Sequence, residues 1–144
     1  LLYLKDQELK QYIEKIFVGY RETVSDVKNI LDKYSIGVAH NKVIHLISLY
    51  EGITISELLK KLKITKQSLN RVLKELKRLK LIKQVRDKND TRRKLLYLDQ
   101  NGKKFYQEVF ESQKKRIFNA LKHSDSDSVI KFKEVLKKII NGKK

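Results

Sequence analysis

The spacing of apolar residues predicts that most of this chain is helical. Apolar side chains return every three or four residues through 1–20, 24–34 and 39–50, which is the period of one face of an α-helix. Residues 35–37 interrupt the pattern, and Gly52 ends it. The same period returns over about 100–122, with Asp99 as the expected helix cap, and in a last helix that starts within 124–127.

Two short helices in the middle of the chain have the clearest boundaries. Thr54 is expected to cap the first, and Glu57 to reach back to it in a reciprocal capping box. Thr65 is expected to cap the second, which follows a tight connection and covers 66–80. One clean apolar stripe runs along this second helix and consists of Leu69, Val72, Leu73, Leu76 and Leu79.

A basic hairpin follows these helices. Residues 81–86 and 94–98 are predicted to be two short strands, and the polar segment 87–91 is their turn. Two short helices joined by a tight turn and followed by such a hairpin make a winged helix-turn-helix. The predicted fold class is therefore mainly α with a small β-hairpin wing.

Positive charge is concentrated in this middle part. The chain has 34 basic and 17 acidic residues, a net charge of +17, and 12 of those net charges lie within residues 60–94. Lys supplies 27 of the basic residues, which indicates an A+T-rich genome, so the local concentration is more informative than the total. An excess of this kind is typical of a protein that meets a polyanion, either nucleic acid or an acidic membrane surface.

The composition excludes several kinds of chemistry. Without Cys the chain forms no disulfide, thiolate zinc site or cysteine redox sensor. The histidines at 40, 45 and 123 do not come together at metal-ligand spacing. No Gly-rich phosphate loop, activated nucleophile or carboxylate pair is visible, so we expect no enzyme activity, no cofactor and no metal. No apolar run approaches the roughly 20 residues needed to span a bilayer.

The polar face of helix 66–80 has the residue types that read DNA. Gln67 and Asn70 suit the paired hydrogen bonds of adenine, and Arg71 suits guanine. Lys88, Arg92 and Arg93 give the hairpin the cations that a narrow minor groove attracts.

Three alternatives compete with sequence-specific DNA reading. A basic amphipathic helix is most often only the solvated face of a packed helix, but here a capped helix precedes it and a basic hairpin follows. A membrane-surface protein would need an exposed apolar face opposite the basic one, and here that face is needed for the core. A sequence-tolerant architectural or nucleoid protein with the same fold remains the main alternative, and a preference for one site by about a thousandfold or more would argue against it.

Several motifs occur in an ordered arrangement along the chain. Residues 52–58 lead into the first short helix, and 64–73 form the start of the second. Residues 90–92 have the form Asp-x-Arg, and 98–102 open the long helix with a capping residue and a Gly. This order and spacing resemble the MarR family of bacterial transcription regulators over nearly the whole chain. The segment 37–45 is similar to a subgroup of that family from alphaproteobacteria.

Two positions depart from the family pattern. Gln84 stands where the family often has an Arg, so one DNA-backbone contact is expected to be lost or to move to Arg86. Lys80 stands in place of a Gly at the turn into the first strand, which puts the geometry of that turn in question but not the fold.

The resemblance implies a role for each polar residue of the helix and the wing. The recognition helix 65–80 would enter the major groove and the wing 86–94 the minor groove, with other side chains on phosphates. In the family's wing the Asp orients the Arg. For Asp90 the alternatives are a turn residue bonded to its own backbone or a bidentate partner of Arg92. The residues expected to contact DNA are Thr65, Lys66, Gln67, Ser68, Asn70, Arg71, Lys74, Arg86, Lys88, Asp90, Arg92 and Lys94.

The resemblance also implies a homodimer that binds an inverted-repeat operator. Within a single domain of 1–144, the dimerisation helices would be 1–34 and 103–144, and the DNA-binding part would be 39–98. The terminal apolar stripes agree independently, because they are rich for helices that face solvent. The alternative is that both stripes cover one monomeric core.

Two further expectations follow from the resemblance. Family members often bind a small molecule between the dimerisation and DNA-binding parts, and five residues here are candidates for such a pocket, although packing roles are the more frequent use of such side chains. They are Tyr12, Tyr20, Tyr34, His40 and His45. A bacterial transcription regulator of this kind would work in the cytoplasm, associated with the nucleoid.

Overall fold

The computed structural model describes residues 1–142 and confirms the mainly α-helical fold class. Its elements in chain order are η1 (Leu2–Leu4), α1 (Asp6–Ser25), α2 (Lys28–Lys33), α3 (Val38–Leu49), β1 (Ile53–Thr54), α4 (Ile55–Leu62), α5 (Lys66–Arg78), β2 (Ile82–Arg86), β3 (Lys94–Leu98), α6 (Gln100–Leu121) and α7 (Ser126–Asn141).

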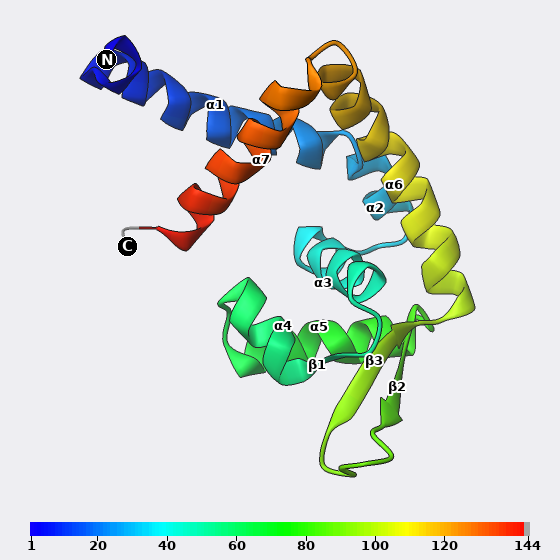
Figure 1. Cartoon of the computed structure of the whole chain (residues 1–144). Helices are drawn as coiled ribbons and strands as arrows, with labels where there is room; N and C mark the ends of the chain where they lie inside the picture. Colours follow the sequence, from blue (N-terminus) through cyan, green and yellow to red (C-terminus); the bar gives the residue numbers. More distant parts are fainter. Residues whose placement is uncertain (143–144) are drawn as a thin grey trace.

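The elements form a lobe and an arch (Figure 1). The lobe contains α3, α4, α5 and the sheet, from which the β2–β3 hairpin extends. The arch consists of α1, α6 and α7, and α7 folds back from the far end of α6 (Figure 1). The predicted hairpin is therefore confirmed as a wing that extends from the lobe.

One apolar core holds the lobe together. Every buried hydrophobic side chain among the described residues lies between Val27 and Val109. The core brings together α2, α3, α4, α5, the sheet and the first three turns of α6. Helices α1 and α7 contribute none of its buried residues, so within the described part of the chain the arch has almost no core of its own.

The sheet has one strand more than the apolar pattern predicts. Its order is β1-β3-β2, and all pairs are antiparallel. The strand β1 has only two residues, which pair with Leu96 and Leu95 of β3. So short a strand leaves no periodic signal in a sequence, because alternation needs at least four residues to appear.

The helix caps follow the predicted residues. The Thr65 hydroxyl accepts a hydrogen bond from the Ser68 N–H at 3.1 Å, and the Thr54 hydroxyl accepts one from the Glu57 N–H at 3.2 Å. The expected return bond differs, because the Glu57 carboxylate accepts from the Thr54 hydroxyl at 3.0 Å and not from the backbone.

Two lysines flank α5 in the left-handed backbone conformation. Lys63 has φ +52° and Lys80 has φ +58°. At Lys80 the turn into β2 is intact, because the Leu81 N–H donates to the Leu76 carbonyl at 2.9 Å. The substitution of Lys for Gly therefore keeps the turn, at a cost of about 1 kcal/mol in backbone strain.

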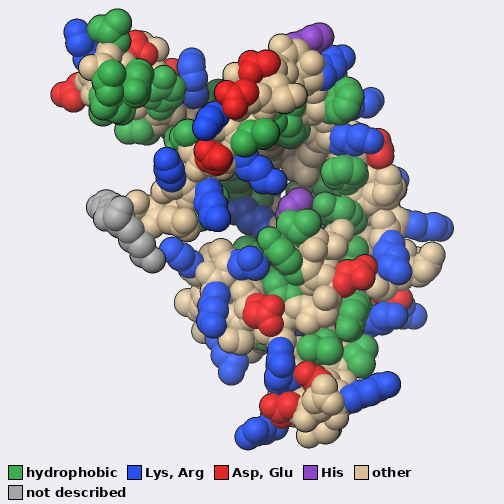
Figure 2. Space-filling model, in the orientation of Figure 1, with side chains coloured by type: hydrophobic (Ala, Val, Ile, Leu, Met, Phe, Trp, Pro, Cys, Tyr) green, Lys and Arg blue, Asp and Glu red, His purple; other side chains and the backbone are tan. Residues whose placement is uncertain are grey.

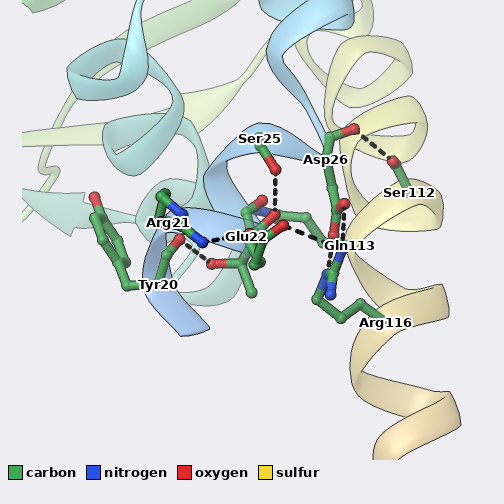
Figure 3. Close-up of polar contacts among 9 residues, drawn as sticks. Tyr20, Arg21, Glu22, Ser25, Asp26, Ser112, Gln113 and Arg116 are labelled. Atoms are coloured by element: carbon green, nitrogen blue, oxygen red, sulfur yellow. Dashed lines mark hydrogen bonds and ion pairs between the residues drawn. The ribbon is translucent and has the colours of Figure 1, made fainter. Parts of the chain in front are cut away.

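A polar joint fixes α1 against α6 (Figure 3). The guanidinium of Arg116 donates through two nitrogens to the two carboxylate oxygens of Asp26, with the Nη2–Oδ1 distance at 2.9 Å. The Ser112 hydroxyl donates to the Asp26 carbonyl at 2.9 Å. The bond from Arg116 lowers the pKa of Asp26, which keeps this carboxylate charged over a wider pH range.

Gly102 lets the start of α6 approach the turn that precedes β2. A Cβ atom at this position would lie 1.9 Å from the Leu81 carbonyl oxygen. The same oxygen accepts the backbone N–H of Asp99, the cap of α6, at 2.9 Å. The helix can therefore seat on the lobe only if residue 102 has no side chain.

We expect Gly102→Ala to lower the free energy of unfolding by about 1–3 kcal/mol, because either the helix or the Leu81 turn must shift. Urea denaturation at one fixed protein concentration measures the change. Gly37→Ala is the matched control, since its Cβ would have an ordinary contact at 3.8 Å and should cost less than about 1 kcal/mol. Equal losses in the two variants would contradict the packing role of Gly102.

Candidate nucleic-acid interface

Helix α5 divides sharply into a buried and an exposed side. Leu69, Val72, Leu73 and Leu76 are buried, as the stripe predicts. The exposed side chains are Lys66, Gln67, Asn70, Arg71, Lys74, Lys77 and Arg78. Because the buried side is held by the core, the exposed row is presented on a helix with a fixed position.

The first turn of α5 organises its hydroxyl groups. The Thr65 hydroxyl, while it accepts the Ser68 N–H, donates its own hydrogen to Ser68 Oγ at 2.9 Å. Ser68 therefore keeps its hydroxyl hydrogen for an acceptor outside the protein. Of the two hydroxyl groups expected at the interface, that of Ser68 has the hydrogen that is not used in the cap.

One cation links the recognition helix to the wing. Lys77 Nζ donates to Gln84 Oε1 at 2.7 Å, from α5 to β2. Gln84 is the position where the family often has an Arg, so a positive charge still lies beside it, supplied from the helix. Lys77 is not among the predicted DNA contacts. The only feature of the sequence that pointed to this junction of α5 and β2 is the departure from the family pattern at Gln84.

At the wing turn, one carboxylate oxygen of Asp90 accepts two hydrogen bonds. Asp90 Oδ1 accepts the Arg92 backbone N–H at 3.1 Å and the Arg92 Nε at 3.3 Å. Of the two alternatives for Asp90, the turn bond to the Arg92 backbone is present, and the contact with the Arg92 side chain is not bidentate, because only one carboxylate oxygen and one guanidinium nitrogen take part. The Arg92 side chain is 91% exposed, so this contact holds it only loosely.

Arg93 belongs to the base of the wing. Its guanidinium lies 3.6 Å from an oxygen of Asp87 and 3.8 Å from one of Glu57, so it ties the hairpin to α4. This differs from the expectation that Arg93 serves the hairpin tip. The other predicted cations of the wing, Arg86, Lys88 and Lys94, are exposed.

The carboxylates of the basic segment are all paired. Glu75 contacts His40, Asp87 contacts Arg93 and Asp90 contacts Arg92, and these are the only acidic residues within 60–94. Lys and Arg side chains are spread over the lobe and the wing (Figure 2). A polyanion that approaches this surface therefore meets mostly uncompensated positive charge.

A recess lies between the arch and the lobe. Its volume is about 340 Å³, and α1, α3, α4 and α6 line it. Tyr20 and His45 are part of its wall. Tyr12, Tyr34 and His40 are not, which corrects the expected pocket.

The three other residues are used elsewhere. Tyr34 packs edge-on against Phe105 and donates to Glu108, His40 contacts Glu75, and Tyr12 is exposed on α1. These are the packing and structural roles that such side chains most often have.

Two polar groups of this recess stand out. Asn41 is 9% exposed, and its Oδ1 has no hydrogen-bond partner among the described residues. Burial lowers the pKa of His45 and raises that of Tyr106, whose hydroxyl lies 3.1 Å from His45 Nδ1. Burial therefore favours the neutral form of both the imidazole and the phenol.

Residues 1–142 contain no group of three His, Asp or Glu side chains placed to hold a metal ion. Among the same residues, no helix has the length and apolar character needed to cross a bilayer.

Comparison with known proteins identifies the family. The model of the MarR family matches residues 39–93, from α3 to the wing. The HTH-type transcriptional regulator PetP of Rhodobacter capsulatus is 35% identical over 141 residues, which cover 98% of this chain and 85% of PetP. The chain belongs to the MarR family.

Solved structures of other MarR-like regulators share the fold. Streptococcus pneumoniae FabT in complex with DNA is 19% identical and superposes with a TM-score of 0.73, over 95% of this chain and 96% of FabT. NadR in complex with 4-hydroxyphenylacetate is 20% identical, with a TM-score of 0.77 over 89% of this chain and 91% of NadR. MarR proteins are DNA-binding transcription regulators and not enzymes.

The geometry at Asp90 leads to a prediction for the wing. Asp90→Asn keeps an oxygen that can accept the Arg92 N–H, so the turn should survive, while one negative charge is removed. Because an exposed ion pair is worth only about 0.2–1 kcal/mol, we expect this variant to bind every DNA duplex more tightly than the wild type.

A double-mutant cycle with Arg92→Ala, followed by DNA affinity at fixed salt, measures the coupling. Additive effects agree with the turn role. Weaker binding by Asp90→Asn, which disappears once Arg92 is Ala, would instead identify Asp90 as the residue that orients Arg92.

Proposed function

We propose that this member of the MarR family is a homodimeric, sequence-specific DNA-binding transcription regulator. The observation that carries this proposal is the exposed row of base-reading side chains on α5, a helix whose opposite side is packed into the core. Such a helix can enter a major groove without reorganisation, and an extended basic wing can follow the backbone into the neighbouring minor groove.

In this proposal the predicted residues keep their roles. Lys66, Gln67, Ser68, Asn70 and Arg71 face base edges, and Arg92, beside Asp90, enters the minor groove. Thr65, Lys74, Arg86, Lys88 and Lys94 contact phosphates, and Lys77 joins them from the helix–wing junction. FabT, which has the same fold, forms a complex with DNA, and this supports DNA binding by this fold.

Surface area supports the homodimer. The chain exposes 11249 Å², whereas a compact monomer of 17.1 kDa exposes about 7,700 Å². The excess of about 3,500 Å² is enough to supply an obligate dimer interface. Large apolar side chains remain exposed along the arch, and they include Leu9, Tyr12, Ile16 and Phe17 of α1 and Phe132, Val135, Leu136 and Ile139 of α7. Hydrophobic side chains gather on the N-terminal arm in Figure 2.

The domain limits belong to the same proposal. Residues 1–34 and 103–144 act as dimerisation helices and 39–98 as the DNA-binding part. Helix α6 serves both, since Phe105 and Val109 are buried in the lobe while Ile117 and Phe118 are exposed.

A small-molecule effector and the cellular location complete the proposal. The recess between arch and lobe is where an effector would bind, and the unpartnered Oδ1 of Asn41 would accept a hydrogen bond from it. NadR, whose structure contains 4-hydroxyphenylacetate, has the same fold. A regulator of bacterial transcription works in the cytoplasm, where it associates with the nucleoid.

Selection of bound sites from random double-stranded DNA tests the dimer and the specificity together. We expect an inverted repeat with half-site centres about 10 base pairs apart, because two recognition helices must enter successive major grooves on one face. Light scattering should give twice the 17.1 kDa mass of one chain. A stable monomer that binds an asymmetric site would contradict the dimer, and a protein that prefers no sequence would support the architectural alternative.

Direct reading of bases distinguishes two exposed residues of α5. Asn70→Ala should cost roughly 1–3 kcal/mol per half-site and relax the preference at one base pair. Lys74→Ala should weaken binding to all duplexes alike and lower the salt dependence by about one unit per contact. Titrations of both variants on selected and shuffled sites, at several salt concentrations, compare them. The same uniform loss in both would show that α5 is not the reading helix.

A further inference from the structure

The recognition helix has one polar tie to the helix that lies behind it. His40 Nε2, near the start of α3, lies 2.8 Å from Glu75 Oε2 on α5. The His40 side chain is only 15% exposed. Glu75 is the one acidic residue of α5, whose exposed row is otherwise basic and neutral polar. This tie does not belong to the surface described as the DNA interface.

The second ring nitrogen settles the direction of the bond. The Gly37 backbone N–H, at the N-cap of α3, points at His40 Nδ1 at 3.2 Å. A backbone N–H can only donate, so Nδ1 is the acceptor and the ring proton is on Nε2. The imidazole therefore donates to Glu75 while it caps its own helix.

This hydrogen bond gives α5 a preferred orientation, which its apolar contact with the core does not. The side of α5 that meets the core is aliphatic, and burial of such side chains is non-directional. A short hydrogen bond to a carboxylate is directional and is stronger than a bond between neutral groups. It resists rotation of α5 about its axis, and rotation would displace Asn70 and Arg71, which lie about one turn from Glu75.

We propose that His40, through Glu75, is a positioning residue that determines the DNA-sequence specificity of α5 without touching DNA. The inference rests on the proposed function, because it concerns how well the exposed row meets base edges. Misplacement of a reading helix costs the contacts that need alignment and spares those with phosphates. Loss of the tie should therefore reduce preference for the selected site and leave affinity for unrelated DNA unchanged.

Two substitutions at His40 separate its two bonds. In His40→Asn the amide oxygen can still accept the Gly37 N–H, but the side chain is too short to reach Glu75. In His40→Gln the amide nitrogen can still donate to Glu75, and the amide oxygen is an acceptor for the Gly37 N–H of the kind found in a capping box. Neither variant replaces a lysine, an arginine or a carboxylate, and His123→Asn, on the exposed α6–α7 turn, is the control.

The readout is the ratio of affinities for the site selected by the wild type and for a shuffled duplex of the same composition. We expect His40→Asn to lower this ratio about tenfold or more, the scale of one lost base contact. His40→Gln and the control should keep it. Thermal unfolding, measured in parallel, should change by a similar small amount in the two variants, because each keeps an acceptor for the Gly37 N–H.

A second pair of variants removes the same contact from the side of α5, at Glu75. This pair keeps the test possible if a His40 variant does not fold. Glu75→Gln and Glu75→Ala remove the same charge, but only Gln can accept from His40. Both should bind the shuffled duplex more tightly to the same extent, and only Glu75→Ala should lose preference for the selected site.

The outcomes separate this inference from the proposed function. A wild type with no preference for any site would overturn both. A wild type with a clear preference that His40→Asn or Glu75→Ala keeps within about twofold would overturn the positioning role alone. An equal loss of preference in His40→Asn and His40→Gln would also overturn the positioning role through Glu75, because His40→Gln keeps a donor for Glu75.

Discussion

The protein depends on a single apolar core that leaves both ends of the chain outside it. The buried hydrophobic residues run from Val27 to Val109, and they fix α5 and the wing in one rigid lobe. Beyond that core, the arch exposes large apolar side chains that cost free energy in water. The same chain therefore combines a lobe with a packed apolar core and helices whose large apolar side chains remain exposed.

Directional polar contacts decide how the parts of this protein are oriented. Asp26 with Arg116 sets α1 on α6, Lys77 with Gln84 joins the recognition helix to the wing, and Arg93 ties the wing to α4. Aliphatic packing holds these elements together, and the polar contacts add the preferred direction that the hydrophobic effect lacks. Most of these contacts are exposed, so their value lies in geometry more than in stability.

The helix limits from α3 onwards, the caps and the wing strands could be predicted because each has a local cause, whereas α1 covers Asp6–Ser25 and not the expected 1–20. The stripe of α5 and the capping threonines need only neighbouring residues, and they agree with the structure within one or two positions. The strand β1, the single-oxygen contact at Asp90 and the pairs of His40 and Lys77 could not be predicted. Each depends on residues far along the chain or on the exact path of a turn, which no local pattern encodes.

The left-handed lysines at either end of α5 have a consequence for how far this protein can be stabilised. Glycine would adopt φ +52° and +58° without strain, yet Lys63 and Lys80 occupy those places. Each therefore exchanges some folding free energy for a cation at an end of the recognition helix. Substitutions chosen only to raise the melting temperature would replace these two lysines by glycine first. The protein would then gain stability and lose part of its attraction for polyanions.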